Sequence, residues 1–399
     1  MKKHNPKIRI ENLIKIYGET PLPALQMFRE GKNRDAILEA TGQVLGIADV
    51  SLQIERGELF VVMGLSGSGK STLARCINRL IEATSGSIYI DDEDIVRVSE
   101  ERMRQIRQKK VSMVFQKFGL FPHKTVAENV EYGLQVRGME KGQRRRKALE
   151  TLEVVGLAQW AKYRPSSLSG GMQQRVGLAR ALATDADVLL MDEAFSALDP
   201  LIRREMQDEL LRLQQELQKT IVFISHDIQE ALKLGDRVAV MKEGAIVQLG
   251  TPEELVVKPA DDYIRGFIAD VNRARVLKVD SIVRPTTALV MERDSVESAR
   301  AKMLRENLDL IYVVNEAGFP VGTVGDRNFN RADLAEEGEN QSVSQIMESN
   351  FPQVTASTML ENLLPLYQRG IPVAVVDAEG KLAGVANFSD ALKRIVSES

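Results

Sequence analysis

Short apolar runs recur along the first two thirds of the chain, and polar or helix-forming stretches separate each run from the next. Each run has five residues, of which at least four are apolar. Such near-continuous apolar strands, alternating with helices, are typical of a mainly parallel sheet that is covered on both faces. The pattern predicts an α/β core with strands at 59–63 (LFVVM), 111–115 (VSMVF), 188–192 (VLLMD), 221–225 (IVFIS) and 237–241 (RVAVM).

The last third of the chain contains an internal repeat. The segment 311–324 (IYVVNEAGFPVGTV) resembles the segment 373–386 (VAVVDAEGKLAGVA) at a spacing of 62 residues. A helix-forming stretch precedes each copy, at 296–306 and 359–368. The pattern predicts a unit of helix, strand, turn, strand and helix that occurs twice, and two such half-buried copies usually pack on each other. Chance similarity between two β-hairpins is the alternative.

Composition narrows the class of protein. The 399 residues favour two or three domains, and 44% hydrophobic with 27% charged residues is ordinary for a soluble globular protein. The net charge of −3 argues against a dedicated nucleic-acid binder. One cysteine, Cys76, excludes an internal disulfide and fits a reducing compartment. No apolar run approaches the roughly 20 residues that span a bilayer, and no apolar segment follows the basic N-terminus, so we expect neither a membrane span nor a signal peptide.

Charge is divided unevenly along the chain. From Lys278 onward, 12 basic and 18 acidic residues give a net charge of −6, whereas the preceding part carries +3. An acidic C-terminal part that follows a slightly basic one supports a division into domains and makes a salt-dependent interaction of the C-terminal part plausible.

The strongest chemical signal follows the first predicted strand. Residues 64–71 (GLSGSGKS) match the pattern G-x-x-x-x-G-K-[ST] and lie between that strand and a helix-forming stretch. Glycines let backbone N–H groups surround phosphate oxygens, and the helix N-terminus adds partial positive charge. We expect Lys70 to reach the β- and γ-phosphates, Ser71 to hold Mg²⁺ through its hydroxyl, and Thr72 to lie near the α-phosphate. The other nucleotide-binding candidates in the loop are Gly64, Leu65, Ser66, Gly67, Ser68 and Gly69.

Two adjacent carboxylates, Asp192 and Glu193, end the predicted strand 188–192. The carboxyl ends of parallel strands meet at one edge of the sheet, so both acids are expected beside the phosphate loop. We expect Asp192 to assist the metal through water. Glu193 would orient and polarise the attacking water as general base.

The chain has three histidines. His226 ends the predicted strand 221–225 and is a candidate contact for the γ-phosphate, with a satisfied residue at the sheet edge as the alternative. His4 and His123 are expected to be surface or loop residues without a chemical role.

Residues 168–175 (LSGGMQQR), followed by VGLARAL, look like the signature motif of ATP-binding-cassette (ABC) ATPases. A serine and two glycines precede a predicted helix and make a second anion-binding N-terminus. The resemblance implies a head-to-tail dimer, in which the phosphate loop of one subunit and the signature of the other enclose each ATP. The signature residues that would contact the nucleotide are Ser169, Gly170 and Gly171.

Further motifs resemble those of the same family. Gln116 matches the glutamine that contacts Mg²⁺ and moves with the membrane partner, which implies metal-binding and catalytic roles. The segment 196–199 (SALD) matches the D-loop, whose Asp199 would lie at the nucleotide, and His226 matches the catalytic switch histidine. Tyr17 resembles the aromatic residue that stacks on adenine, with strand packing as the alternative.

An insertion at about 19–46 narrows the resemblance to ATP-binding subunits of glycine betaine/L-proline importers, which carry paired cystathionine-β-synthase (CBS) domains. This implies an α/β fold class: a P-loop ABC ATPase domain, with a mainly parallel sheet core, an antiparallel β subdomain and a helical subdomain, plus an α+β tandem CBS (Bateman) module. The expected domains are 1–275 for the ATPase, 276–338 for the first CBS domain and 339–399 for the second.

The CBS pair departs from the pattern of CBS domains that bind adenine nucleotides. Those domains usually end the second strand with G-x-[IV]-[ST]-x-x-D, whose Asp contacts ribose. The segment from Gly384 keeps Asp390, with Asn387 in place of Ser or Thr, whereas Asn328 stands at the corresponding position after Gly322. A ligand is therefore doubtful in the first half-site, and a structural or electrostatic role of the pair is the alternative.

The resemblance implies an ATP-hydrolysing subunit that energises import of glycine betaine, proline or related compatible solutes, with ATP and Mg²⁺ as cofactors. Its implied partners are transmembrane permease subunits, a second copy of itself and, indirectly, an extracytoplasmic solute-binding protein; no nucleic acid is expected. The subunit would lie peripherally on the cytoplasmic face of the inner membrane, and its CBS pair is a candidate site for a regulatory ligand or a sensor of ionic strength. The alternatives are another cargo (choline, carnitine, a polyamine or methionine) and a soluble ABC ATPase without a transport role.

Two surface features allow two interpretations each. The basic run 144–147 (RRRK) is expected to be a solvated helix face, with contact to anionic lipid as the sharper alternative. Phe118, Leu120, Phe121 and Val126 either belong to the core or line the groove that receives a helix of the transmembrane subunit.

Overall fold

The computed structural model describes residues 5–115, 119–196, 198–291, 293–329 and 341–396. The chain divides into two compact units, Met1–Ala269 and Asp270–Ser399. The predicted boundary after residue 275 lies six residues beyond this division. Arg275 packs within the second unit, where its Nε lies 3.0 Å from Glu361 Oε1.

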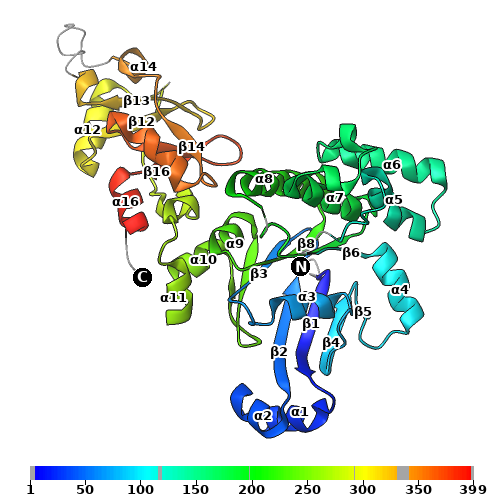
Figure 1. Ribbon diagram of the computed structural model, residues 1–399. Helices are drawn as coiled ribbons and strands as arrows, with labels where there is room; N and C mark the ends of the chain where they lie inside the picture. The colour runs from blue at the N-terminus through cyan, green and yellow to red at the C-terminus, as the bar shows by residue number, and fades with distance from the viewer. Residues whose placement is uncertain (1–4, 116–118, 197, 292, 330–340, 397–399) are drawn as a thin grey trace. The chain divides into compact units, whose positions relative to one another are not determined.

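A six-stranded sheet forms the centre of the first unit (Figure 1). In the order β10-β9-β3-β8-β7-β6, all neighbours are parallel except the edge strand β10, which is antiparallel to β9. The five predicted strands are confirmed to within one residue at each end. The bounds are β3 (Leu59–Met63), β6 (Val111–Val114), β7 (Val188–Asp192), β8 (Thr220–Ser225), β9 (Arg237–Lys242) and β10 (Ala245–Gly250).

Burial on both faces explains why these strands are apolar throughout. In β3, Leu59, Val61 and Met63 pack into a cluster with the helices on one face. Phe60 and Val62 point the other way, into a cluster shared with the antiparallel sheet. Burying one such side chain stabilises the fold by roughly 1.5–3 kcal/mol, so each strand contributes to two cores at once.

Helices cover the parallel sheet and connect its strands (Figure 1). The longer ones, α5 to α8, supply much of one core cluster, while α3 and α4 contribute to the other. The sequence 251–254 (TPEE) predicts a helix start, with Thr251 as the cap, proline at the first helical position and Glu254 completing a capping box. The structure confirms this capping box. The bounds are α3 (Lys70–Ile77), α4 (Glu100–Lys109), α5 (Val126–Val136), α6 (Lys141–Val154), α7 (Gly170–Ala183), α8 (Pro200–Leu217), α9 (Ile228–Leu234), α10 (Pro252–Val257) and α11 (Asp262–Ile268), with short 3₁₀ turns at Ala158–Trp160 and Pro165–Ser167.

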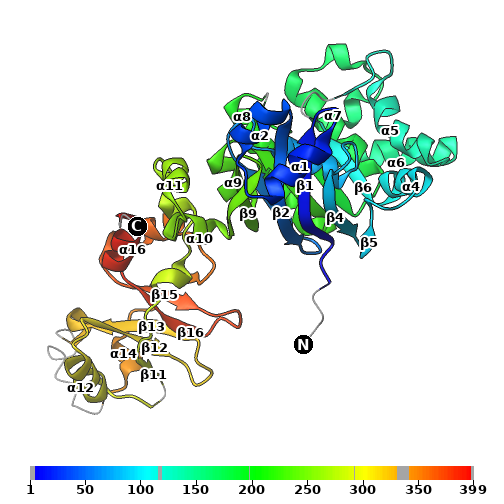
Figure 2. The same cartoon turned by 90° about the horizontal axis from the view of Figure 1, so that it is seen from below.

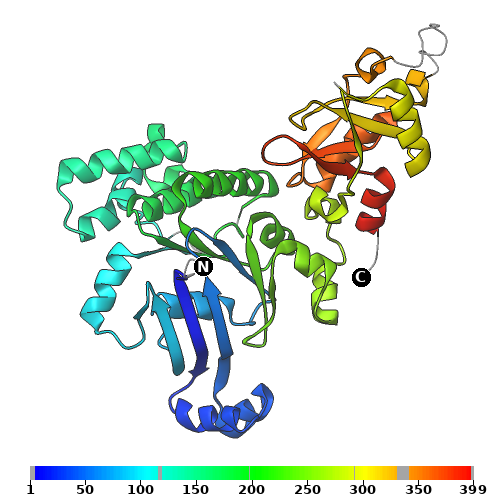
Figure 3. The same cartoon turned by 180° about the vertical axis from the view of Figure 1, so that it is seen from behind.

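A four-stranded antiparallel sheet, ordered β2-β1-β4-β5, packs beside this core. Its bounds are β1 (Ile8–Tyr17), β2 (Val44–Ile54), β4 (Ser85–Ile90) and β5 (Glu93–Asp94). The predicted insertion forms two helices, α1 (Pro21–Arg29) and α2 (Arg34–Thr41), between β1 and β2 at one end of the sheet (Figures 1 and 3). A small apolar cluster anchors them to the strands through Ile14, Ile16, Ala24, Leu25, Ile37 and Leu45.

The second unit contains the predicted repeat. Two three-stranded sheets, β11-β12-β13 and β14-β15-β16, each begin with a parallel pair and end with an antiparallel pair (Figure 2). The leading strands β11 and β14 were not part of the predicted unit, because three residues are too few to give a period. The bounds are β11 (Ala288–Val290), α12 (Val296–Glu306), β12 (Leu310–Val314), β13 (Pro320–Gly325), α14 (Val343–Ile346), β14 (Gln353–Thr355), α15 (Leu360–Leu363), β15 (Val373–Val376), β16 (Leu382–Ala386) and α16 (Phe388–Val396), with 3₁₀ turns at Arg273–Arg275, Val279–Ile282 and Leu364–Arg369.

The two halves of the second unit pack on each other, as the repeat predicts. The Tyr312 hydroxyl donates to Pro372 O at 2.7 Å, and burial raises the pKa of this phenol. Leu382 N donates to Gly318 O at 3.0 Å. These bonds join strands and turns of different halves, so neither half is independent of the other.

A cluster of charges ties the two sheets of the first unit together. Lys7, which is 2% exposed, places its Nζ 2.8 Å from both Asp91 Oδ1 and Asp187 Oδ2. Arg56 and Lys110 also contact Asp91, at 2.8 and 3.0 Å. Burial alone would raise the pKa of Asp91, but the hydrogen bonds from Lys7 and Lys110 hold it down at about 2. Segments before β1, β3 and β6 therefore meet at the Asp91 carboxylate after β4, and Lys7 links them to Asp187 before β7.

We predict that Asp91→Ala lowers the free energy of unfolding at pH 7 by about 2 kcal/mol, because the buried Lys7 loses one of its two carboxylate partners. The folded pKa lies below the usual unfolded value of about 3.9, so the carboxylate contributes fully above about pH 4 and loses its contribution as the pH falls towards 2. Denaturant titrations at pH 7 and pH 3 measure this, and the difference from wild type should shrink at pH 3. Asp92→Ala, at an exposed neighbour, should cost less than about 0.5 kcal/mol; an equal effect of both variants would contradict the prediction.

Candidate functional site

The glycine loop 64–69 joins β3 to α3 and follows a path that only glycine allows. The angle φ is +150° at Gly64 and +103° at Gly69. A Cβ at Gly64 would lie 2.2 Å from Met241 O, and one at Gly69 would lie 2.6 Å from Gly46 O. The loop therefore combines unusual backbone angles with close backbone packing, which is what a phosphate-cradling loop requires.

Lys70 begins α3 and is only 4% exposed. Its Nζ donates to Gly64 O and Leu65 O, both at 2.9 Å. Burial lowers the pKa of Lys70, while the negative charges of Glu193 and Asp192 raise it. The ammonium group thus lies inside the loop on neutral carbonyl partners, where a phosphate would make stronger, charge-assisted hydrogen bonds.

Ser71 and Asp192 form a pair of hard oxygen donors at the loop. Ser71 Oγ donates to Asp192 Oδ1 at 2.7 Å, and Asp192, the last residue of β7, is 3% exposed. Arg75 Nη2 lies 3.4 Å from the other carboxylate oxygen. In the described part of the chain, no group of three or more His, Cys, Asp or Glu side chains could hold a metal. A hydroxyl and one carboxylate fit Mg²⁺, which usually keeps several waters and binds substrate phosphates.

Glu193 and His226 face each other from neighbouring strands. His226 Nδ1 lies 3.5 Å from Glu193 Oε2, and the imidazole is 56% exposed while the carboxylate is mostly covered. Glu193 has φ of +48°, a conformation that costs a non-glycine residue about 1 kcal/mol or more. Its N–H donates to Ile224 O at 3.1 Å, so β8 holds this strained residue in place.

Tyr17 lies beside the start of α3. Its hydroxyl is 2.9 Å from Thr72 Oγ1, and its ring is 38% exposed. The ring also lies against Gly46, where an added Cβ would be 2.7 Å from Tyr17 Cε2. Sequence reasoning missed Gly46 as a site residue, although a glycine inside a strand is a signal of close approach.

The signature residues and Asp199 begin two helices. Ser169 Oγ accepts from Met172 N at 3.3 Å, and Ser169 and Gly170 are exposed at the N-terminus of α7. A Cβ on Gly171 would lie 2.7 Å from Ile202 Cγ2, so this glycine lets α7 approach α8. Asp199 caps α8 by accepting from Ile202 N at 3.1 Å. The helix start at Ser169 is open to a further molecule, because these side chains bond only locally here.

Gln116 and Phe118 lie outside the described residues, as does His4. His123 lies exposed in a turn, as expected. Val126 is fully buried in the core, and Phe121, whose N–H donates to Asn129 Oδ1 at 2.7 Å, is half-buried.

The basic run 144–147 is engaged by acids of the same unit. Arg144 and Arg145 contact Glu131 at 3.4 and 2.8 Å. Arg146 lies 3.7 Å from Glu150. These pairs agree with a helix face whose charges are balanced locally.

In the second unit, Asn328 and Asp390 occupy the two positions at which nucleotide-binding CBS domains carry their Asp. Asn328 is buried, accepts from Gly325 N at 2.9 Å and donates to Ile346 O at 2.8 Å, so its side chain is fully used within the fold. Asp390 forms an ion pair with Arg284. A 420 Å³ pocket lies at this ion pair, lined by Ser281, Ile282, Val283, Arg284, Asp390, Lys393 and Arg394.

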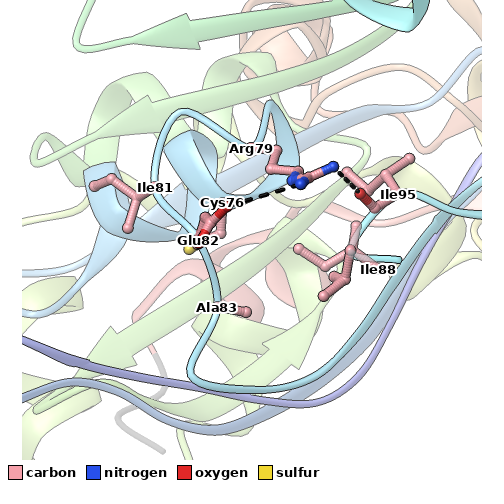
Figure 4. Close-up of a pocket in the computed structure, with 8 residues that line it drawn as sticks. Cys76, Arg79, Ile81, Glu82, Ala83, Ile88 and Ile95 are labelled. Carbon is pink, nitrogen blue, oxygen red and sulfur yellow. Dashed lines mark hydrogen bonds and ion pairs between the residues drawn. The ribbon is translucent and has the colours of Figure 1, made fainter. Parts of the chain in front are cut away.

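A separate pocket of 220 Å³ lies at the C-terminal end of α3 (Figure 4). Arg79 crosses it and donates to Ile95 O. Cys76 lines it and is buried, and burial raises the pKa of its thiol to about 12. A thiol of this kind is protonated at neutral pH and is a poor nucleophile.

Comparison with known proteins places these residues in a family context. Residues 47–196 match the family described as ABC transporter, and residues 343–397 match the CBS domain. The glycine betaine transport ATP-binding protein OpuAA of Bacillus subtilis (strain 168) is 46% identical over 95% of this chain and 90% of its own length. The glycine betaine/proline betaine transport system ATP-binding protein ProV of Escherichia coli (strain K12) is 44% identical over 98% of both chains.

A solved structure is similar to the first part of the chain. It is the dimeric post-hydrolysis state of the ATP-binding cassette MJ0796 bound to ADP and Pi, with a TM-score of 0.53 and 32% identity over 61% of this chain and 98% of that one. No helix among the described residues is both long and apolar enough to cross a membrane.

We predict that Cys76 resists alkylation in the folded protein, because its thiol is buried and protonated. Treatment with a maleimide at pH 7 should modify less than about a tenth of the native protein in the time that fully modifies the protein in denaturant, as measured by intact mass. Rapid labelling of the native protein would contradict this assignment.

Proposed function

The chain belongs to the ATP-binding proteins of glycine betaine ABC transporters, and from this premise we propose that it hydrolyses ATP to drive import of glycine betaine or a related compatible solute. The observation that carries the proposal is the extent of the similarity. It covers 95–98% of this chain for the two relatives, against 61% for the cassette structure, and a CBS domain matches at 343–397. Another cargo, such as choline or carnitine, is the alternative.

Nucleotide binding begins at the glycine loop in this proposal. Lys70 exchanges its two carbonyl partners for the β- and γ-phosphates, and the loop amides and the N-terminus of α3 supply further donors. Tyr17 stacks on adenine and Thr72 lies near the α-phosphate. The position of Tyr17 beside Thr72 supports this arrangement.

Mg²⁺ would be held by Ser71, Gln116 and Asp192. Asp192 would contact the ion through a water molecule. When bound, the ion offsets negative charge on the phosphates. The hydrogen bond between Ser71 and Asp192 supports the assignment, because it brings a hydroxyl and a carboxylate together at the loop.

Glu193 acts as the general base. Its carboxylate accepts a proton from the water that attacks the γ-phosphorus, and ADP leaves. His226, 3.5 Å from that carboxylate, contacts the γ-phosphate and keeps the carboxylate aimed at the water. The fold itself places both groups within 3.5 Å of each other, so the chemistry depends on positioning and electrostatics.

A second copy of the chain completes each site. Ser169, Gly170 and Gly171 at the open start of α7, with Asp199 at the start of α8, would face the nucleotide held by the glycine loop of the other copy. The dimeric cassette structure supports this arrangement. ATP binding closes the dimer, and hydrolysis with phosphate release reopens it.

The subunit would work at the cytoplasmic face of the inner membrane as a peripheral protein. It would bind the permease directly and depend indirectly on an extracytoplasmic solute-binding protein. The CBS pair would regulate transport through a ligand or through ionic strength. Because Asp390 is engaged by Arg284, a ligand in the second half-site would have to compete with this ion pair.

We predict that Glu193→Gln keeps ATP affinity within about threefold of wild type but lowers turnover about 100-fold or more, because the amide cannot accept the proton. The variant should accumulate as an ATP-bound dimer in size-exclusion chromatography. Glu216→Gln, on the exposed side of α8, is the matched control and should hydrolyse ATP normally. Normal turnover of Glu193→Gln would remove this residue from the base role.

We predict that cells lacking other osmoprotectant importers take up labelled glycine betaine when they carry this chain with its permease and solute-binding protein. Lys70→Ala in the same cells should abolish uptake. Unlabelled choline and carnitine serve as competitors. Uptake of labelled choline or carnitine without any uptake of glycine betaine would overturn the proposed cargo and leave the ATPase assignment intact.

A further inference from the structure

Helix α8 holds the loops that follow β7 and β8 through two side chains on one face. Arg203 and Gln207 are four residues apart, so they lie one above the other. The Arg203 guanidinium donates to Leu198 O at 3.2 Å in the loop after β7. It also lies 3.5 Å from Asp227 Oδ2 in the loop after β8. Arg203 therefore links the two loops that carry Asp199 and His226.

Gln207 binds a buried carboxyl group, Glu230 of α9. Gln207 Nε2 donates to Glu230 Oε1 at 3.1 Å, and Ser225 Oγ donates to Glu230 Oε2 at 2.5 Å. Glu230 is 7% exposed, and the other two side chains are also buried. Ser225 Oγ in turn accepts from Asp227 N at 3.0 Å. Both oxygens of the carboxyl group thus have partners, one on α8 and one at the end of β8.

The environment of Glu230 raises the pKa of its carboxyl group. Burial raises its pKa, the hydrogen bonds from Ser225 and Gln207 lower it, and the nearby charges of Asp227 and Arg203 act in opposite directions. The net direction is upward. Glutamine has the same shape as this side chain. Its Oε1 can accept from Gln207 Nε2, and its Nε2 can donate to Ser225 Oγ, which has a second lone pair beside the one used by Asp227 N.

His226 lies between the two residues that this network holds. Ser225 precedes it and Asp227 follows it, so its backbone is fixed on both sides while its imidazole stays largely exposed. The distance of 3.5 Å between His226 Nδ1 and Glu193 Oε2 depends on that backbone. A misplacement of about 1 Å in such a pair can cost roughly 100-fold in rate.

We infer that Glu230 and Gln207 are positioning residues for ATP hydrolysis, which hold His226 against Glu193 without touching the nucleotide. The inference rests on the proposed function. Gln207 and Glu230 would then connect α8, which Asp199 caps, to the loop that carries His226.

The test compares Glu230→Ala, Glu230→Gln and Gln207→Ala in the full-length protein, with Gln229→Ala, at an exposed position of α9, as the control. Steady-state ATP hydrolysis gives kcat and KM, and a fluorescent ATP analogue gives the affinity. We expect Glu230→Ala to lower kcat about tenfold or more with KM and affinity within about threefold, because the glycine loop is untouched. Glu230→Gln should restore kcat to within about threefold of wild type. Gln207→Ala should also lower kcat, and Gln229→Ala should leave it unchanged.

Three results would overturn the inference. They are a wild-type kcat in Glu230→Ala, an equal loss of kcat in Glu230→Gln and Glu230→Ala, or a loss of kcat/KM that comes entirely from a rise in KM. If Glu230→Ala fails to fold, as circular dichroism would reveal, Gln207→Ala and Glu230→Gln decide the question. Absence of ATP hydrolysis in the wild-type protein would instead contradict the proposed function. The two failures are therefore distinguishable.

Discussion

Three adjacent parallel strands end at the same level, and the chemistry of the first unit depends on this register. Met63 of β3 pairs with Ser225 of β8, and Asp192 of β7 pairs with Ile224 of β8. The glycine loop follows β3, Glu193 follows β7 and His226 follows β8. The sheet therefore brings the glycine loop, a carboxylate and an imidazole to one edge, and a slip of one residue would turn these side chains to the wrong face.

The same sheet explains why the site is rigid. Its strands are buried on both faces, so the backbone that carries the site cannot shift without disturbing two apolar clusters. The strained φ of Glu193 persists because its N–H bonds to β8. Helix α8 extends this control beyond the sheet edge, since Arg203 and Gln207 reach both neighbouring loops. Pre-organised groups of this kind lower the barrier without further rearrangement when charge develops on the phosphate.

Local pattern was enough to predict the strands, the glycine loop, the capping box at Thr251 and the repeat of the second unit. It also predicted that Asp192 would lie beside the loop, where it contacts Ser71. It could not predict pairs whose members are far apart in sequence, such as Lys7 with Asp187 or Tyr312 with Pro372, because these depend on how elements pack. Glu230 was missed for the same reason, because it looks ordinary in its own segment and its role comes from neighbours in space. Gly46 lies inside a strand, which is a signal of close approach, but only the packing of Tyr17 against it shows what approaches.

The proposed dimer places each ATP between the glycine loop of one subunit and the signature of another, and a mixture of two inactive variants tests this arrangement. Lys70→Ala removes the loop's cation, and Ser169→Arg blocks the signature of the facing site. In a head-to-tail dimer, a mixed pair contains one site with both halves intact, so the mixture should recover up to about a quarter of wild-type ATP hydrolysis although neither variant alone is active. A mixture that stays as inactive as its components, or a Ser169→Arg protein with full activity by itself, would contradict the account.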